Sequence, residues 1–280
     1  MKVPDRIKPL IHEGHVDRVI TQLMSGKEAT VYVVESGDKL MCAKIYKEAN
    51  QRSFKHNSDY TEGRRVRNSR RSRAMEKSSR YGRQEREEAW QNTEVEAMIR
   101  AAAAGVRVPQ IYNYVESVLL MELIVDEEGN PAPRLHDVSF TADEARTHHQ
   151  HMLTEIVRLL CCGMVHGDLS EYNVLFGEVG PVIIDFPQAV DAAGNNNASK
   201  ILERDVRNMA SFFGRFAPEL ISTNYGKEIW DLYRKGKLTT ETKLTGKFES
   251  KFGPVNVRDV LQVIDDAREE AVKAAERKNS

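Results

Sequence analysis

Two short polar segments joined by apolar runs restrict the fold of this chain more than any other feature. Residues 165–173 read Val-His-Gly-Asp-Leu-Ser-Glu-Tyr-Asn, and residues 182–186 read Val-Ile-Ile-Asp-Phe. An apolar run follows Asn173 and another precedes Asp185, each with the composition of a strand. Two strands joined by a short turn form a hairpin. We therefore expect the side chains of Asp168, Asn173 and Asp185 to lie close together.

These three side chains suit the chemistry of ATP-dependent phosphoryl transfer. The transferred group carries dispersed negative charge, so an enzyme positions the reactants and neutralises that charge with cations. Asn173 and Asp185 are candidate ligands of Mg2+ or Mn2+, which take protein oxygens together with phosphates and water. Asp168 is the candidate general base for an incoming hydroxyl. Each string alone also fits a turn or a helix cap, but three side chains in this order favour catalysis.

The length and composition fit a soluble globular protein with one large domain or two lobes. The chain has 280 residues, 40% hydrophobic and 30% charged, and a formal net charge of -1. This charge predicts no overall attraction to nucleic acid or an anionic membrane. No apolar run approaches a bilayer span and no signal peptide opens the chain, so a cytoplasmic location is expected. Cys42, Cys161 and Cys162 lack the spacing of a zinc site and are predicted to be buried thiols.

Short β-rich runs between turn signals predict a small antiparallel sheet. Its strands are expected at 18–24, 30–35, 40–46, 111–115 and 118–123. Helix-forming residues with apolar side chains near one face predict a helix from Glu85 to Ala104. Thr141 and Glu144 have the spacing of a capping box that starts a helix running to Cys162. Further helices are expected at 199–213, at 226–235 and from about Asn256.

Four segments together resemble the RIO family of atypical serine/threonine protein kinases, within the protein-kinase-like superfamily. They are Ser-Gly-Lys-Glu-Ala-Thr-Val-Tyr at 25–32, Cys-Ala-Lys-Ile-Tyr at 42–46, the segment 166–173, and Ile-Asp-Phe-Pro-Gln at 184–188. The resemblance implies an α+β, two-lobed fold with a small antiparallel-sheet N-lobe, one main helix there, and a mainly helical C-lobe. It places an extension at 1–17, the N-lobe at 18–123 and the C-lobe at 124–280. A member of this single-domain type has no N-terminal winged helix.

The resemblance also assigns the nucleotide site. The turn formed by Ser25, Gly26, Lys27, Glu28 and Ala29 would cradle the ATP phosphates with its backbone N–H groups. Lys44 would contact the α- and β-phosphates. An inward-pointing lysine needs a carboxylate partner; Glu94 is the first candidate and Glu96 the second.

A second set of residues concerns the adenine and the catalytic loop. Met121 would be the gatekeeper, and the backbone around Glu122 and Ile124 would hydrogen-bond adenine, although the same string also fits a buried strand. Asp205 resembles the helical aspartate that braces the catalytic loop. Ser170 stands where many protein kinases carry a lysine, so charge stabilisation must come from another group.

Two segments depart from common protein kinases. The loops read His-Gly-Asp and Asp-Phe-Pro instead of His-Arg-Asp and Asp-Phe-Gly, as in RIO proteins. Only a short link, 192–197, separates Asp185 from the next helix, so a peptide-docking platform is doubtful.

An insertion at about 50–84 contains nine Lys or Arg between Gly63 and Arg83 against one acid. It is expected to be flexible, and it fits contact with RNA or a ribosomal subunit, a phosphorylated regulatory segment, or a solvated loop.

The predicted function is therefore an ATP- and Mg2+-dependent RIO-type serine/threonine protein kinase, with a protein substrate or the chain itself as acceptor. An ATPase switch is a credible main role. Two alternatives stay open at this point. One is a small-molecule phosphotransferase of the aminoglycoside or choline kinase type, which also uses a His-Gly-Asp loop. The other is a nucleotide-gated RNA-binding scaffold without turnover.

Overall fold

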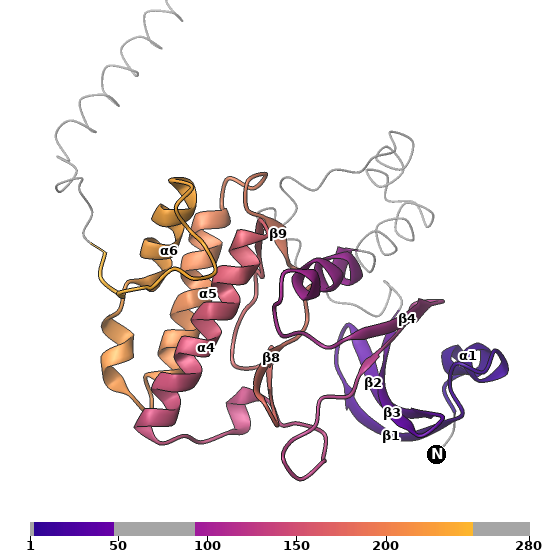
Figure 1. Ribbon diagram of the computed structural model, residues 1–280. Helices are drawn as coiled ribbons and strands as arrows, with labels where there is room; N and C mark the ends of the chain where they lie inside the picture. Colours follow the sequence, from indigo (N-terminus) through magenta and orange to yellow (C-terminus); the bar gives the residue numbers. More distant parts are fainter. Residues whose placement is uncertain (1–2, 48–92, 249–280) are drawn as a thin grey trace, which may run out of the picture. The chain divides into compact units, whose positions relative to one another are not determined.

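Five antiparallel strands form one sheet in the order β1-β2-β3-β5-β4 (Figure 1). The computed structural model describes residues 3–47 and 93–248. The strands are β1 (Arg18–Ser25), β2 (Ala29–Ser36), β3 (Lys39–Tyr46), β4 (Ile111–Val115) and β5 (Val118–Glu122). They coincide with the five β-rich runs of the sequence, so the predicted antiparallel sheet is confirmed.

The two faces of the sheet have different partners because side chains alternate along each strand. One face buries Met41, Ala43 and Ile45 of β3 against Ile7 and Leu10. These two residues come from the 3-10 helix η1 (Asp5–Ile7) and the helix α1 (Lys8–His12). The segment before the first strand thus packs against the sheet. The opposite face of β3 therefore carries its even-numbered residues, including the lysine of the candidate site.

The second part of the described chain is mainly helical. Its helices are α4 (Ala142–Cys161), α5 (Ala198–Phe213) and α6 (Tyr225–Arg234), with 3-10 turns η4 (Leu135–Asp137) and η5 (Pro218–Ser222). Thr141 and Glu144 form the predicted capping box at the start of α4. Two small two-stranded antiparallel sheets lie beside these helices: β6 (Met164–Val165) pairs with β9 (Val190–Asp191), and β7 (Val174–Gly177) forms a hairpin with β8 (Gly180–Ile183). The predicted helices at 199–213 and 226–235 are confirmed.

The prediction of three buried thiols is wrong for Cys161. Cys42 is buried and Cys162 is half-buried, but Cys161 is exposed. It is the last residue of α4, and it is exposed although Val157, one turn earlier on the same face, is buried. The apolar neighbours in the sequence therefore gave the wrong answer at this helix end.

Two predicted features fall outside the described residues. They are the helix from about Asn256 and the basic segment from Gly63 to Arg83. Residues 85–92 of the predicted helix that contains Glu94 also lie outside the described residues. Residues 93–103 of that helix are described and helical. Met1–Gly246 form one unit and Lys247–Ser280 a second. In the described ranges, no helix has an apolar stretch long enough to cross a bilayer.

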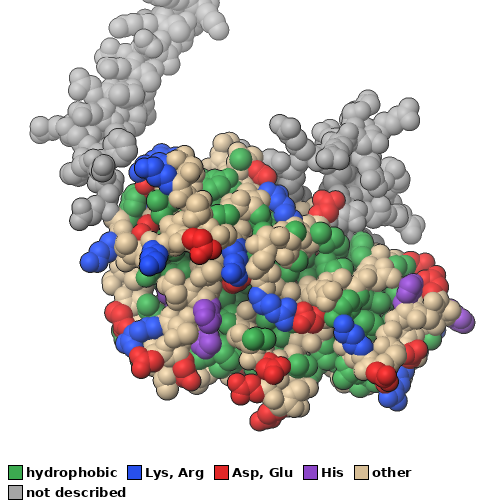
Figure 2. Space-filling view, viewed as in Figure 1, with side chains coloured by type: hydrophobic (Ala, Val, Ile, Leu, Met, Phe, Trp, Pro, Cys, Tyr) green, Lys and Arg blue, Asp and Glu red, His purple; other side chains and the backbone are tan. Residues whose placement is uncertain are grey.

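Lys and Arg side chains alternate with Asp and Glu over the face shown in Figure 2. Acidic side chains gather at the lower edge of that face, over the loop after β5 that contains Asp126, Glu127 and Glu128. This mixture agrees with the formal net charge of -1. Any strong attraction to a polyanion must therefore come from a local group of residues.

His149 makes the stability of the helical part depend on pH. It lies on α4 with 2% of its surface exposed, between the rings of Phe213 and Tyr225. Burial lowers its pKa from 6.5 to about 4. The unfolded chain therefore binds the extra proton first as pH falls, so stability is complete above pH 6.5 and declines towards pH 4. At pH 5 this one group lowers the free energy of unfolding by about 2 kcal/mol relative to its value above pH 6.5.

The free energy of unfolding of the wild type should fall between pH 8 and pH 5. We expect this fall to be about 2 kcal/mol smaller in His149→Phe. Urea unfolding at both values measures the difference. His151→Phe, on the exposed side of the same helix, is the control and should keep the wild-type loss. Equal acid losses in all three proteins would contradict the assignment to His149.

Candidate active site

The β7–β8 hairpin sets the positions of Asn173 and Asp185. Val174 pairs with Ile183 at its open end, and the N–H of Ile184 donates to the carbonyl of Asn173 at 3.0 Å. Asp185 follows directly with a φ of 71°, a left-handed conformation that few residues other than glycine adopt. Such backbone strain is common at functional sites. The hairpin thus holds the amide and the carboxylate at the same end of two strands.

Asp168 is linked to Asn173 by two hydrogen bonds. The side-chain amide of Asn173 donates to the backbone carbonyl of Asp168 at 2.8 Å and to its Oδ2 at 3.2 Å. Because the amide nitrogen is used here, the amide oxygen of Asn173 is left as its ligand atom. Partial desolvation raises the pKa of Asp168 from its ordinary value, although the charge of Arg204 and the bond from Asn173 act against this shift. A carboxylate with a raised pKa is a better proton acceptor.

His166 braces the loop in one tautomer. Its Nδ1 accepts the backbone N–H of Asp168 at 3.2 Å, so its Nε2 carries the proton and donates to the carbonyl of Ile184 at 3.1 Å. Burial lowers the pKa of His166 to about 4, which keeps the ring neutral at physiological pH. The ring also packs against Phe186. His166 therefore connects the loop of Asp168 to the strand end that carries Asp185.

Asp205 of α5 supports the same loop from below. Its carboxylate accepts the backbone N–H groups of Gly167 at 2.8 Å and Leu169 at 3.3 Å. Burial raises its pKa to about 7, although these N–H groups and Arg204 favour the charged form. The Arg204 guanidinium also donates to the carbonyl of Gly167. Asp205 thus contacts the loop backbone and Arg204, which lies 3.4 Å from its Oδ1, and this fits the bracing position expected from the sequence.

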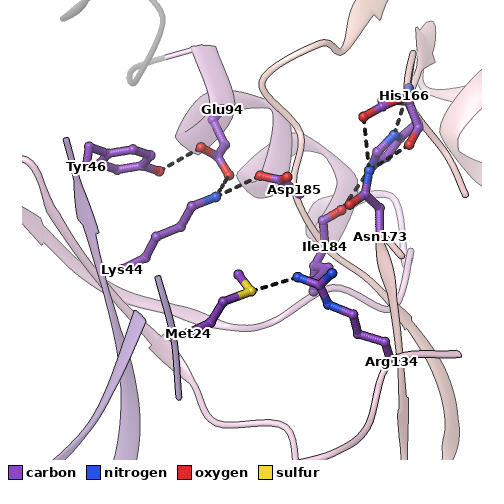
Figure 3. Close-up of polar contacts among 10 residues, drawn as sticks. Met24, Lys44, Tyr46, Glu94, Arg134, His166, Asn173, Ile184 and Asp185 are labelled. Atoms are coloured by element: carbon purple, nitrogen blue, oxygen red, sulfur yellow. Dashed lines mark hydrogen bonds and ion pairs between the residues drawn. The ribbon is translucent and has the colours of Figure 1, made fainter. Parts of the chain in front are cut away.

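Lys44 lies in a buried network on the sheet face that looks towards the hairpin (Figure 3). Its Nζ donates to Glu94 at 2.6 Å and to Asp185 at 2.9 Å, and the hydroxyl of Tyr46 donates to Glu94 at 2.8 Å. Glu94 is 1% exposed, whereas Glu96 is exposed. The structure therefore places Glu94, the first candidate of the sequence analysis, beside Lys44.

This network fixes the charge of its members. Burial alone would lower the pKa of Lys44, but Asp185 and Glu94 raise it well above its ordinary value. Burial alone would raise the pKa of Asp185, but Lys44 and His166 lower it below its ordinary value. Both groups are thus charged at neutral pH. Asp185 joins the sheet and the hairpin into one polar site.

The turn between β1 and β2 faces this site and is held by Lys47. The Nζ of Lys47 donates to the carbonyl of Gly26 at 2.6 Å and to the hydroxyl of Ser25 at 3.2 Å. The N–H of Gly26 donates to the carbonyl of Ala29 at 2.9 Å. A Cβ added to Gly26 would meet only that carbonyl, at 3.6 Å, which is an ordinary contact. Neither φ nor packing within the chain requires glycine at this position, and the space beside it is open to a ligand.

The end of β5 and the segment after it are held by bonds to other parts of the chain. The N–H of Glu122 donates to the carbonyl of Gln110 at 2.8 Å, and the carbonyl of Ile124 accepts the N–H of Ala132 at 2.9 Å. The carboxylate of Glu122 is held by both terminal nitrogens of Arg107 at 2.8 Å each. The N–H of Glu122 and the carbonyl of Ile124 are thus engaged within the chain.

The structure thus brings together the hairpin residues, Lys44 and Glu94, while Met121 lies in β5 opposite Cys42 of β3. Several residues around the site were missed from the sequence: Tyr46, Lys47, Arg134, Arg204 and Asn208. Of these, Tyr46 had a detectable signal, because a tyrosine two residues after Lys44 lies on the same strand face. The others join segments far apart in the chain.

Gly167 is required by both its conformation and its surroundings. Its φ is 88°, and an added Cβ would lie 2.3 Å from the carbonyl oxygen of Gln188. We expect Gly167→Ala to destabilise the fold by more than about 2 kcal/mol, because a left-handed alanine costs about 1–2 kcal/mol and the clash adds to this. Denaturant unfolding measures the change. Gly14→Ala is the matched control, since Gly14 has a φ of 75° but an added Cβ would meet no atom within 4 Å. An equal decrease in the free energy of unfolding in both variants would contradict the clash at Gly167.

Comparison with known proteins points to one family. The family model of the RIO domain matches residues 30–225. The RIO-type serine/threonine-protein kinase Rio1 of Haloferax volcanii is 37% identical over 212 residues, covering 75% of this chain and 68% of that protein. Rio1 of Methanocaldococcus jannaschii is 32% identical over 227 residues, covering 80% and 70%. The serine/threonine-protein kinase rio1 of Schizosaccharomyces pombe is 32% identical over 210 residues, covering 74% of this chain but 40% of that protein.

A solved structure has the same fold. The ADP/Mg2+-phosphoaspartate complex of the Rio2 kinase from Chaetomium thermophilum aligns with a TM-score of 0.54 and 18% sequence identity. The alignment covers 83% of this chain and 74% of that one. The predicted fold class, an α+β two-lobed kinase-like fold, is therefore confirmed.

Proposed function

The chain belongs to the RIO domain family, whose matched members are serine/threonine protein kinases, and from that premise we propose that it transfers the γ-phosphoryl group of ATP to a hydroxyl acceptor in a Mg2+-dependent reaction. The observation that carries this proposal is the connection of Lys44, Asp185, Asn173 and Asp168 through hydrogen bonds and charge in one site. Two acids, an amide and a lysine from separate elements meet there. Phosphoryl transfer uses such side chains to bind the metal ion, to accept a proton and to hold the phosphates.

The nucleotide would lie against the sheet. Lys44 would hold the α- and β-phosphates, and the turn at 25–29 would approach them with its backbone. Adenine would bind beyond β5, where the carbonyl of Glu122 and the N–H of Ile124 face the ligand and Met121 limits the depth of the pocket. Support comes from the position of Lys44 and from the space beside Gly26.

The residues present fit a magnesium ion. Asn173 offers an amide oxygen and Asp185 a carboxylate with a lowered pKa, both hard oxygen ligands. Among the residues that the structure describes, no group of three or more His, Cys, Asp or Glu could form a complete metal cage. Mg2+ suits such an incomplete set, because it usually takes one or two protein ligands and completes its shell with phosphates and water. When bound, it would neutralise charge on the phosphates.

Asp168 would act as the base. The acceptor oxygen forms a bond to the γ-phosphorus while the bond from that phosphorus to the β,γ-bridging oxygen breaks. The acceptor proton passes to the Asp168 carboxylate, and ADP leaves with the electron pair. Asn173 orients that carboxylate through its bond to Oδ2, and the neutral His166 and Asp205 hold the loop. The chain's own groups therefore position the acceptor and receive its proton.

The acceptor is a protein hydroxyl in this proposal, and ATP hydrolysis as a switch is the second candidate. The observation that favours the second is the short connection after Asp185, where β9 at Val190–Asp191 is followed by α5 from Ala198. This leaves little chain for a peptide-docking platform. Membership of the RIO family argues against a phosphotransferase for small molecules.

An assay with γ-labelled ATP tests the proposal. Label transfer to a protein or to the chain itself supports a kinase, release of phosphate without an acceptor supports an ATPase, and label on an aminoglycoside would overturn both. Tight ATP binding with turnover at the background level would instead support the nucleotide-gated RNA-binding scaffold. Contact of the basic segment Gly63 to Arg83 with RNA stays a hypothesis from the sequence; RNA binding that is unchanged on its deletion would refute it.

A further inference from the structure

Arg134 lies between the hairpin and the turn at 25–29. Its backbone forms a β-bridge with Leu175, which follows Asn173 by two residues in the chain. Its guanidinium reaches Met24, with Nη2 2.7 Å from the thioether sulfur. Met24 is near the end of β1, directly before the turn. The guanidinium therefore spans the region where the phosphates of a bound nucleotide would lie.

The contacts of this guanidinium do not match its charge. Within residues 3–47 and 93–248, no carboxylate lies within ion-pairing distance of Arg134, although the side chain is half-buried. A thioether is only a weak acceptor. Carboxylates and phosphates match the planar guanidinium in geometry and bind it much more strongly than a thioether does. The partner that is missing should therefore be an anion that enters the site.

Three other cations near the site are already engaged, whereas the exposed Lys27 lies in the turn at 25–29 itself. Lys44 is held by Glu94 and Asp185. Lys47 binds the carbonyl of the glycine turn, and Arg204 donates to the backbone of the catalytic loop. Ser170 occupies the position at which many protein kinases carry a lysine. A positive charge for the terminal phosphate must come from elsewhere, and Arg134 is in place for it.

The close-up supports this position. Figure 3 shows the Arg134 guanidinium directed towards Met24, below Ile184 in this view, with Lys44 at the upper left.

We propose that Arg134 is a catalytic residue that leaves Met24, donates hydrogen bonds to the γ-phosphate of ATP, and neutralises the charge on the phosphoryl group during transfer. This inference rests on the proposed function. It assigns to Arg134 a role that the loop lysine has in many protein kinases. An arginine suits this role because it presents several N–H donors to phosphate oxygens and stays charged.

The test compares nucleotides that differ only in the terminal phosphate. Arg134→Met keeps the length and the apolar contact with Met24 but removes the charge, and Arg134→Lys keeps a point charge. Arg146→Met, on the exposed side of α4, is the control. Calorimetry gives the Kd of ADP and of the β,γ-imido analogue of ATP, each with Mg2+, and labelled ATP gives kcat.

We expect Arg134→Met to weaken binding of the imido analogue about 10- to 100-fold while the Kd of ADP stays within about twofold. The kcat should fall about 100-fold or more, with partial recovery in Arg134→Lys. Equal weakening of both nucleotides, as a purely structural role would produce, overturns the inference, and so does unchanged discrimination. If the wild type binds neither nucleotide, the proposed function fails as well; if it binds and turns over ATP while Arg134→Met is unaffected, only this inference fails.

Discussion

Replacement of Asp168 by asparagine should reduce kcat by about 100- to 10,000-fold, which is the usual contribution of a positioned general base. The substitution keeps the size of the side chain and leaves Asn173 an oxygen to bond, so the loop should keep its place. The amide, however, cannot accept the acceptor proton. Labelled-ATP turnover measures kcat, and calorimetry with ATP and Mg2+ measures binding, which should stay within about threefold because Asp168 faces the acceptor in the proposed mechanism.

The control for this variant is Asp38→Asn, the same chemical change at an exposed turn between β2 and β3. It should have the wild-type kcat and Kd. A kcat within about threefold of wild type in Asp168→Asn would remove the assignment of the base. A parallel loss of nucleotide binding would instead indicate that Asp168 belongs to the metal site. The two readouts therefore separate a role in proton transfer from a role in binding.

Much of this site was readable from the sequence because its key residues are local. Asp168, Asn173 and Asp185 lie within one hairpin and its flanks, so their proximity follows from strand periodicity and one turn. Lys44 was also detectable, since a charged residue in an otherwise apolar strand needs a special environment. Residues whose contacts are set by a single supersecondary unit can thus be assigned without a tertiary structure.

The helix that contains Glu94 shows how periodicity could have gone further. Glu94, Met98 and Ala101 are spaced by four and three residues and all are buried, whereas Glu96 points the other way and is exposed. The choice between the two glutamates was therefore available from the helical period.

Contacts across the site could not be read from the chain. Met24 and Arg134 are separated by 110 residues, and the bond from Tyr46 to Glu94 spans 48. Such pairs depend on how the sheet and the hairpin approach each other, which no local pattern specifies. The surplus charge of Arg134 becomes visible only when its neighbours are known.

The second large effect is expected from Lys44→Met, which should lower the free energy of unfolding by about 3–5 kcal/mol. The reason is that the Glu94 carboxyl, at 1% exposure, would keep the Tyr46 hydroxyl as a partner but lose the ammonium at 2.6 Å. Glu94→Gln should cost less, because Lys44 retains Asp185 at 2.9 Å. Urea unfolding at pH 7 measures each protein.

A double-mutant cycle decides whether the network acts as a unit. In Lys44→Met/Glu94→Gln neither partner leaves a buried unpaired charge, so the loss should be clearly smaller than the sum of the single losses. Lys39→Met, on the exposed end of the same strand, is the control and should change stability by less than about 1 kcal/mol. Additive losses would show that Lys44 and Glu94 are not coupled. All Lys44 variants should also bind ATP weakly, because the same ammonium that stabilises the buried carboxylate would hold the phosphates.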